Sequence, residues 1–406
     1  MRASVVFLTL VSVCQPATAN WDVRTFSYAG SEGSRANAGG QSTIVGTNLT
    51  PFVPYAGYWN LNGSWTSLNP NRAHSSAAYG GDEQTQVGSA QFPDRTVPSL
   101  WRGTAESWVD LSGTNRTGIA FDAANGIQVG YMQFGRSRAF EWRGSAESGR
   151  DLHPGGWEAS KIYGTDGDNH VGYAEQGSFR MASLWTNDGF VQLGSFDFFR
   201  TEAYGTHSGT QVGYSQSDRM EACLWQGSHS SYMSLKPRDS DGNSEALATI
   251  FDTQVGYAEF NERERAGIWY GSANSWEDLS TSLPAWAISS RATAVWIHEG
   301  RLNVAGYYRG GDNRAVLWSR PVPEPSGAVA LASSVALLLA QRRVRVKRRL
   351  SASTSRHNRC HARCHPHSAA KPSSGSQASF RKRTSTGRSC LFKLRRVDSR
   401  TPMGRD

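Results

Sequence analysis

Between residues 20 and 320, apolar and aromatic residues gather in short segments of four to six residues, and clusters of Gly, Asn, Asp and Ser separate these segments. Runs of this length are too short for helices and are typical of β-strands. The intervening clusters are typical of turns between strands. The pattern therefore predicts an all-β domain over this part of the chain.

The strand segments recur with a regular period. A segment similar to Gln-Val-Gly-Tyr occurs seven times, at intervals of 42, 42, 42, 41, 43 and 50 residues, and its glycines are Gly46, Gly88, Gly130, Gly172, Gly213, Gly256 and Gly306. A tryptophan follows each glycine after 12 or 13 residues, at Trp59, Trp101, Trp142, Trp185, Trp225, Trp269 and Trp318. Six copies carry an alanine three residues before the tryptophan, and Pro98 replaces it in the second copy.

Each repeat contains four short segments. The first ends about nine residues before the glycine in an aromatic or apolar residue, as at Tyr79, Phe121, Tyr163 and Tyr204. The glycine segment, the Ala-x-x-Trp segment and a Trp-x-Asp-Leu-like segment follow it. Seven repeats of about 42 residues with four strands each predict a seven-bladed β-propeller. A β-solenoid is the alternative, although its coils are usually shorter and its ends need caps.

The repeated residues have expected structural roles in such a propeller. The glycines would let the inner strands approach one another closely near the axis. The tryptophans would fill the space between neighbouring blades. The seventh repeat stops at residue 320 without its fourth segment, whereas residues 20–30 are a single unassigned strand. We therefore expect the N-terminal strand to complete the last blade and close the ring.

The charge is distributed unevenly along the chain. Residues 341–406 contain 19 basic and 2 acidic residues, whereas residues 1–340 contain 24 basic and 32 acidic residues. The net charge of +9 therefore arises from the tail. A basic nucleic-acid-binding domain is a poor interpretation of the main body, and no nucleic-acid partner is expected.

The two ends resemble export signals. Residues 1–19 combine Arg2, an apolar stretch and an Ala-Thr-Ala sequence, which is typical of a cleaved signal peptide; a buried N-terminal strand is the alternative. Residues 321–349 contain Pro323, Glu324 and Pro325, then a short apolar run, then an Arg/Lys cluster. This order resembles the PEP-CTERM sorting signal of bacteria, with a plain C-terminal membrane anchor as the alternative.

The PEP-CTERM resemblance implies an exosortase-type sorting enzyme as partner, a transmembrane segment present during export, and a final place at the bacterial cell surface or outside the cell. Members of that family normally end at the basic cluster, whereas this chain continues over residues 350–406. That tail is rich in Ser, Arg and His, and its composition predicts disorder.

The repeats also resemble the HAF-type extracellular repeat family. The segments at 170–185 and 254–269 carry the likeness, with a Gly-Tyr strand followed by an Ala-x-x-Trp strand. Arginine often precedes the alanine here, where that family commonly has histidine. The resemblance implies an exported repeat protein and no particular activity.

The chemistry-bearing residues form no catalytic motif that we recognise. Asp/Asn-rich turns at 166–169 and 239–243 resemble parts of calcium loops without completing a ligand set. Six histidines of the repeat region occur singly, at His74, His153, His170, His207, His229 and His298. Trp157, Trp286 and Trp296 are candidates for stacking on sugars, although core packing is the commoner role. We therefore predict no catalytic residue, no cofactor and no metal ligand.

These observations favour a non-enzymatic, exported surface or matrix protein that binds a polysaccharide or another protein. The default ligand position is the central funnel of the propeller. The alternative is an extracellular polysaccharide hydrolase or lyase that uses the propeller face. Two or three carboxylates clustered at the funnel mouth would favour that alternative.

Overall fold

The computed structural model describes residues 20–322, apart from 29–30, 51–52, 83 and 114–115. The expected signal peptide, residues 1–19, lies outside the described residues, and so do Pro323, Glu324, Pro325, the rest of the sorting segment and the tail 350–406. Within the described part, every regular element is a strand or a 3-10 turn, so the prediction of an all-β domain is confirmed. No helix in this part is long and apolar enough to span a bilayer.

The strands form antiparallel groups of four, which we call repeat sheets 1 to 7. Repeat sheet 1 contains β2 (Gly33–Gly39), β3 (Thr43–Leu49), β4 (Pro54–Asn60) and β5 (Trp65–Ser67). Repeat sheet 2 contains β6 (Ser75–Gly81), β7 (Gln86–Gln91), β8 (Thr96–Trp101) and β9 (Val109–Asp110). Repeat sheet 3 contains β10 (Gly118–Ala124), β11 (Ile127–Phe134), β12 (Arg136–Trp142) and β13 (Arg150–Asp151).

Repeat sheet 4 contains β14 (Ala159–Thr165), β15 (His170–Gln176), β16 (Phe179–Thr186) and β17 (Gly189–Gln192). Repeat sheet 5 contains β18 (Arg200–His207), β19 (Thr210–Gln216), β20 (Met220–Trp225) and β21 (Met233–Ser234). Repeat sheet 6 contains β22 (Ser244–Ile250), β23 (Thr253–Phe260), β24 (Arg263–Tyr270) and β25 (Glu277–Asp278). Repeat sheet 7 contains β26 (Ser289–His298), β27 (Arg301–Arg309), β28 (Asn313–Pro321) and β1 (Asp22–Phe26).

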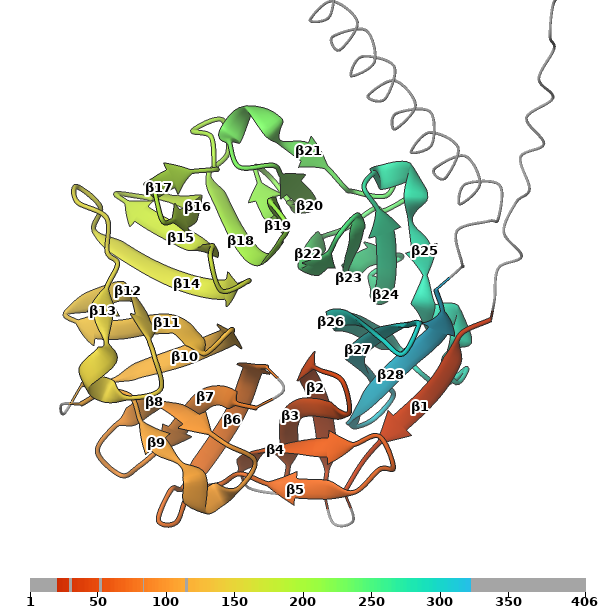
Figure 1. Cartoon of the computed structure of the whole chain (residues 1–406). Coiled ribbons are helices and arrows are strands. Elements are labelled where there is room, and N and C mark those ends of the chain that lie inside the picture. Colours follow the sequence, from red (N-terminus) through yellow and green to blue (C-terminus); the bar gives the residue numbers. More distant parts are fainter. Residues whose placement is uncertain (1–19, 29–30, 51–52, 83, 114–115, 323–406) are drawn as a thin grey trace, which may run out of the picture. The chain divides into compact units, whose positions relative to one another are not determined.

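Five 3-10 turns lie between strands, namely η1 (Ala105–Ser107), η2 (Ala146–Ser148), η3 (His229–Ser231), η4 (Ala273–Ser275) and η5 (Leu279–Ser282). Repeat sheets 4 and 5 join through one parallel pair, Arg180 with Arg200, and together form an eight-stranded sheet. The repeat sheets follow one another around a central space, with β2, β6, β10, β14, β18, β22 and β26 innermost (Figure 1).

The repeated glycines lie where the innermost strand and the second strand come closest. Gly172 of β15 pairs with Ile162 of β14, and a Cβ atom on Gly172 would lie 1.9 Å from the carbonyl oxygen of Lys161. The other six repeated glycines have the same environment. A Cβ atom on each of them would lie 1.8–2.0 Å from a backbone carbonyl oxygen of the innermost strand. No side chain fits there, so each repeat needs glycine at this position.

The repeated tryptophans lie between adjacent repeat sheets, and each is at most 5% exposed. Trp101 of sheet 2, for example, packs against Val45, Ala56 and Leu68 of sheet 1. Trp59 of sheet 1 packs in the same way against Ala305 and other core residues of sheet 7. Each tryptophan therefore attaches its own sheet to the preceding one.

A hydrogen bond also connects neighbouring sheets, and the sequence analysis did not identify it. The backbone N–H of the alanine three residues before the tryptophan donates to a Ser or Thr hydroxyl on the innermost strand of the next sheet, over 2.8–3.0 Å. The six acceptors are Ser76, Ser160, Thr201, Ser244, Ser290 and Ser34. The exception is Pro98, which has no N–H, and Gly118 stands at the matching acceptor position.

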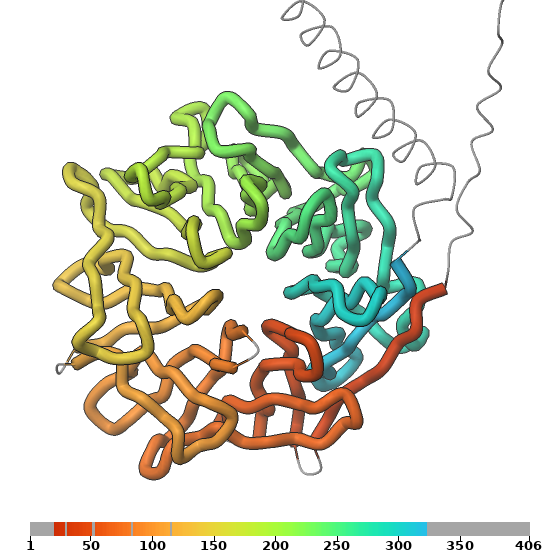
Figure 2. Tube along the Cα trace, in the orientation of Figure 1, coloured from red at the N-terminus to blue at the C-terminus, as the bar shows by residue number. Residues whose placement is uncertain are grey.

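Sheets 7 and 1 meet where the two ends of the domain lie side by side (Figure 2). β1 pairs antiparallel with β28, from Asp22 opposite Ser319 to Phe26 opposite Ala315. Phe26 is 3% exposed, and its ring lies 6.3 Å from that of Trp59. Residues almost 300 positions apart in the chain are thereby held together.

Removing residues 20–30 should lower the melting temperature sharply or cause aggregation. The deletion exposes the edge of β28 and removes the buried Phe26 together with the half-buried Trp21 and Val23. Burying one large apolar side chain contributes about 1.5–3 kcal/mol, against a total stability of about 5–15 kcal/mol. Thermal unfolding of residues 31–320 beside residues 20–320 measures the effect. Equal melting temperatures and solubility would show that β1 contributes little.

Replacing Gly172 with Ala should destabilise the domain by about 1–3 kcal/mol or more, because the new methyl group meets the Lys161 carbonyl oxygen. Gly155 is the matched control, since a Cβ atom there would have no atom within 4 Å. Urea unfolding of both variants gives the two changes in free energy. A similar, small effect at both positions would contradict the proposed close contact.

Candidate functional site

The innermost strands surround a cavity of about 580 Å³. All seven repeat sheets contribute residues to its wall. This is the place that the sequence analysis named as the default ligand position in a propeller. It is larger than four other cavities of the domain, whose volumes are about 520, 300, 290 and 260 Å³.

A β-bulge in each innermost strand determines which side chains line the cavity. The pairing register shifts by one residue directly after the residue opposite the repeated glycine. The bulged residues are Asn37, Tyr79, Phe121, Tyr163, Tyr204, Leu247 and Thr293, and all of them line the cavity. A bulge redirects a side chain that would otherwise follow the strand alternation. The wall is therefore built from one variable position per repeat.

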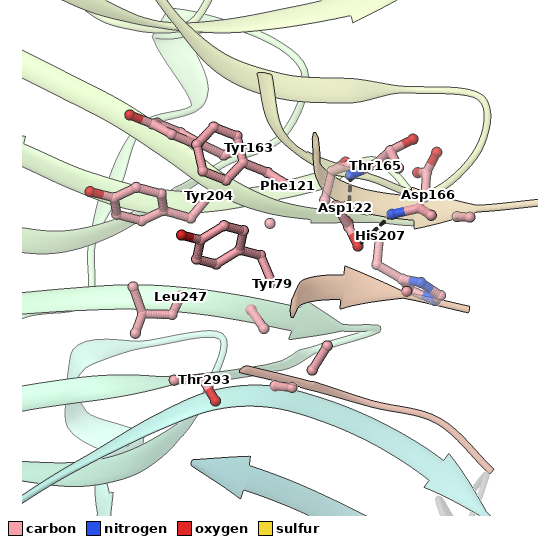
Figure 3. Close-up of a pocket in the computed structure, with 18 of the residues that line it drawn as sticks. Tyr79, Phe121, Asp122, Tyr163, Thr165, Asp166, Tyr204, His207, Leu247 and Thr293 are labelled. Atoms are coloured by element: carbon pink, nitrogen blue, oxygen red, sulfur yellow. Dashed lines mark hydrogen bonds between the residues drawn. The ribbon is translucent and has the colours of Figure 1, made fainter. Parts of the chain in front are cut away.

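Four consecutive bulged positions are aromatic, and we call Tyr79, Phe121, Tyr163 and Tyr204 the aromatic arc. Adjacent ring centroids lie 5.7, 5.1 and 5.3 Å apart in that order. The rings gather on one side of the cavity (Figure 3) and are half-buried. In the sequence these residues stand out only as strand ends and point to no ligand, because the bulge that turns them inward has no sequence signature.

The hydroxyl groups of Tyr163 and Tyr204 remain protonated at physiological pH. Burial raises the pKa of Tyr163 and Tyr204 far above the ordinary tyrosine value. The nearby carboxylate of Glu202 raises the pKa of both side chains further. The arc therefore offers aromatic faces together with the neutral hydroxyl groups of Tyr163 and Tyr204.

A polar group of residues lines the same cavity where β10, β14 and β18 end, beside the aromatic arc (Figure 3). We call this end of the cavity its mouth. The two carboxylate oxygens of Asp122 accept the backbone N–H groups of Ala123 and Thr165, each over 2.9 Å. Burial raises the pKa of Asp122 to about 7, although these two hydrogen bonds oppose the shift, and Asp82 raises it further. Asp166 lines the cavity beside it.

Two further polar groups at the mouth have no hydrogen-bond partner among the described residues. They are the hydroxyl of Thr206 and Nε2 of His207. Thr206 is only 8% exposed. Both residues line the cavity. Unpaired buried polar groups are costly and call for an explanation such as a ligand.

Asp122 departs from the repeat pattern. The residue after the bulge is glycine or alanine in the six other repeats, at Ala38, Gly80, Gly164, Gly205, Ala248 and Ala294. Gly80 of the preceding sheet makes room for Asp122, since a Cβ atom on Gly80 would lie 2.8 Å from the Asp122 carboxylate. The aspartate therefore occupies a position that is otherwise kept small.

Two more departures connect to Asp122 through hydrogen bonds. Glu141 replaces the Leu, Ile or Tyr that precedes the tryptophan elsewhere, and His170 replaces the glutamine of four other repeats. His170 Nε2 lies 3.2 Å from Glu141 Oε2, and His170 Nδ1 lies 2.8 Å from the Thr165 hydroxyl. Burial lowers the pKa of His170, although Glu141 opposes the shift. A neutral ring that donates to Glu141 therefore accepts from Thr165.

The other candidate residues are dispersed. Of the six histidines, His207 lines the cavity, His170 is buried, His153 is bonded to Ser160, and His74 and His229 are exposed. His298 lines a separate cavity of about 290 Å³ between sheets 7 and 1. Trp296 is only 9% exposed and packs in the core, whereas Trp157 is half-buried and Trp286 is 46% exposed.

The two Asp/Asn-rich turns form hydrogen bonds within the protein. Asp166 Oδ1 accepts the backbone N–H groups of Asp168 and Asn169, and the Asp241 carboxylate accepts that of Asn261. In the part of the chain that the structure describes, no three His, Cys, Asp or Glu residues are grouped so that they could hold a metal ion. Cys223 is fully buried in the third strand of sheet 5.

Comparison with known proteins bears on the fold. No model of a protein family matches the chain, and no curated protein does. A crystal structure of puromycin hydrolase aligns with a TM-score of 0.51 and 11% identity, over 74% of this chain and 56% of that one. A mutant of puromycin hydrolase complexed with PGG aligns with a TM-score of 0.50, also with 11% identity and the same coverage.

The β-propeller domain of the Trilobed protease from Pyrococcus furiosus aligns with a TM-score of 0.49 and 8% identity, over 74% of this chain and 98% of that domain. In the alignment with puromycin hydrolase, this chain spans just over half the length of that protein. At 11% identity, that likeness concerns the fold alone. Together with four-stranded antiparallel sheets around a central cavity, it supports a β-propeller fold.

Replacing Asp122 with Asn should change the pH dependence of stability. The raised pKa of Asp122 means that ionisation opposes folding, so the parent loses stability as the pH rises from about 4 to about 7. The asparagine variant has no carboxyl group to ionise at this position. Its free energy of unfolding should therefore rise by about 1–4 kcal/mol relative to that of the parent as the pH increases across that window. Urea unfolding at unit pH steps from 4 to 8 measures it. A difference that stays constant with pH would contradict the assigned pKa.

Proposed function

We propose that the domain is a closed seven-bladed propeller in which repeat sheets 1 to 7 are the blades. Support comes from the pairing of β1 with β28 and from the packing of Trp59 against sheet 7. The hydrogen bond from Ala315 to Ser34 has the same form as those between consecutive sheets. Sheets 7 and 1 thus contact one another through the same interactions as the other neighbours.

We propose that this propeller binds a polysaccharide in its central cavity. The aromatic arc is the observation that carries the proposal. Aromatic faces combined with a few converging polar groups are typical of small-ligand sites, and sugar rings present both apolar faces and hydroxyl groups. Asp122 and Asp166 provide polar groups beside the arc. The protein is then a binding component and not an enzyme.

We further propose that binding takes place outside the cell. The support is in the sequence, where residues 1–19 resemble a signal peptide and Pro323, Glu324 and Pro325 begin a PEP-CTERM-like segment. An exosortase-type enzyme would then process the C-terminal segment after it has entered the membrane. Mass spectrometry of the protein from its native host would detect cleavage near Ala19 and Pro325; intact terminal peptides would contradict it.

The alternative is a polysaccharide hydrolase or lyase that uses the same cavity. Asp122 favours it, because a carboxyl group with a pKa of about 7 can act as a general acid at neutral pH. Glycosidases ordinarily need a second carboxylate, and Asp166 is the candidate in the same wall. Against this role, both Asp122 oxygens accept backbone N–H groups.

Calorimetric titration of the full chain with a panel of oligosaccharides tests the binding proposal. Replacing Tyr163 with Leu should weaken binding at least tenfold, because a ring of the aromatic arc is lost. Phe196 is the matched control, since its ring is 60% exposed and lies outside the cavity. Its replacement with Leu should leave the affinity unchanged.

The same samples distinguish binding from catalysis. A binding protein leaves the oligosaccharides intact over long incubation, as measured by chromatography of the products. New reducing ends or unsaturated products that disappear in the Asp122→Asn variant would favour the hydrolase or lyase instead. Equal loss of affinity in the Tyr163 and Phe196 variants would contradict a role for the arc.

A further inference from the structure

The charges of the cavity mouth suggest which sugars the site accepts. We propose that the bound saccharide is cationic, namely an amino-sugar polymer whose ammonium group lies between the Asp122 carboxylate and the aromatic arc. This inference rests on the proposed polysaccharide binding and adds the chemical class of the ligand.

Among the residues that the structure describes, the cavity wall contains acidic side chains and no lysine or arginine. Among the lining residues that the structure describes, the charged side chains are Asp122 and Asp166, and His207 is the single imidazole. Asp82 lies close enough to act on the Asp122 carboxyl group. The mouth therefore has a negative potential, which attracts cations and repels acidic sugars.

The aromatic arc strengthens the preference for a cation. Phe121 directly precedes Asp122 in β10, and the rings of Tyr79 and Tyr163 lie 5.7 and 5.1 Å from that of Phe121. The faces of aromatic rings attract ammonium groups, especially where water is partly excluded. A carboxylate beside several rings matches an ammonium group attached to a sugar ring.

Asp122 has the capacity to bind a ligand in its present position. Each of its oxygens accepts one backbone N–H, whereas a carboxylate offers about four acceptor positions. Thr206 and His207 line the same cavity, and the Thr206 hydroxyl and His207 Nε2 are buried there without a hydrogen-bond partner among the described residues. The site therefore combines a charge with aromatic faces.

A purely structural role for Asp122 would not require a charge. Asn37 occupies the bulge of sheet 1, and its side-chain amide donates to the carbonyl oxygen of Ala78 in sheet 2 over 2.7 Å. A neutral side chain thus links adjacent sheets at a neighbouring interface. Asp122 makes the comparable link to Thr165 with an acid whose burial is unfavourable. Such a cost is explained when a ligand uses the charge.

Glu141 and His170 act as positioning residues for this carboxylate. His170 fixes the Thr165 hydroxyl, and the backbone N–H of Thr165 donates to Asp122. Glu141 fixes His170 and is itself paired with Arg150 over 3.2 Å. The three departures from the repeat pattern, Asp122, Glu141 and His170, therefore belong to one connected group.

The test measures binding of four hexasaccharides to the full chain by calorimetry. They are β-1,4-linked hexamers of glucosamine, N-acetylglucosamine, glucose and N,N,N-trimethylglucosamine. The trimethylated hexamer keeps its charge at every pH. At pH 8 we expect it to bind at least tenfold more tightly than the two neutral hexamers.

Substitution of Asp122 with Asn should remove this preference. The trimethylated hexamer should lose at least tenfold more affinity than the two neutral hexamers, because it alone loses an opposite charge. Asp168 is the matched control, because it is exposed and does not line the cavity. Its replacement with Asn should leave all four affinities unchanged. Thermal unfolding of each variant verifies that the domain is folded.

A pH series identifies the group responsible. Affinity of the parent for the trimethylated hexamer should fall at least threefold between pH 8 and pH 5.5, because Asp122 takes up a proton. Asp166 and His207 line the same cavity, Asp82 of sheet 2 acts on the Asp122 carboxyl group, and His170 lies behind Thr165. The pH dependence should persist in His207→Gln and disappear in Asp122→Asn.

The outcomes separate the two proposals. Neutral hexamers that bind as tightly as charged ones would overturn the cationic preference and leave polysaccharide binding in place. Absence of binding by all four hexamers would overturn both. An equal loss of affinity for charged and neutral hexamers in Asp122→Asn would show that Asp122 supports the cavity and does not select charge, which also overturns the inference.

Discussion

The repeat depends on one close contact between backbones. In each repeat sheet, one backbone carbonyl oxygen of the innermost strand occupies the space that a side chain of the second strand would need. The second strand therefore carries glycine at this position. The innermost strand bulges directly after the residue that lies opposite this glycine. The side chain of the bulged residue turns toward the central cavity. The contact therefore does two things. It holds the two strands together, and it leaves one side chain per repeat free to vary.

Neighbouring sheets are connected by two further interactions with different physical origins. The tryptophan supplies apolar burial, which is strong and insensitive to direction. The hydrogen bond from the alanine N–H to a Ser or Thr hydroxyl is directional and sets the position of one sheet against the next. Pro98 and Gly118 support this interpretation, because the donor and the acceptor are missing from the same interface. Burial of Trp142 remains at that interface, where it packs against Leu100 and Leu111.

A regular scaffold makes departures from its pattern informative. Asp122 stands where the other repeats have glycine or alanine, Glu141 stands where they have an apolar residue or tyrosine, and His170 replaces a glutamine or an apolar residue. All three carry ionisable groups into partly or fully buried places, which is unfavourable unless the groups are paired or used. The structure connects them at the interface of sheets 3 and 4, next to the aromatic arc. The charge at the cavity mouth is therefore maintained by contacts that the framework alone does not need.

The sequence by itself determined the strand composition and the repeat, because the spacing of Gly172, Trp185 and their counterparts follows directly from strand geometry and from packing between sheets. It also showed which residues are framework, since these recur in nearly every copy. Only the tertiary structure decided what faces the cavity. Tyr163 looked like an ordinary strand residue until a bulge turned it inward, and bulges have no reliable sequence signature. The link from Glu141 through His170 and Thr165 to Asp122 was equally hidden, because it joins residues of different repeats that become neighbours only when the sheets pack around the cavity.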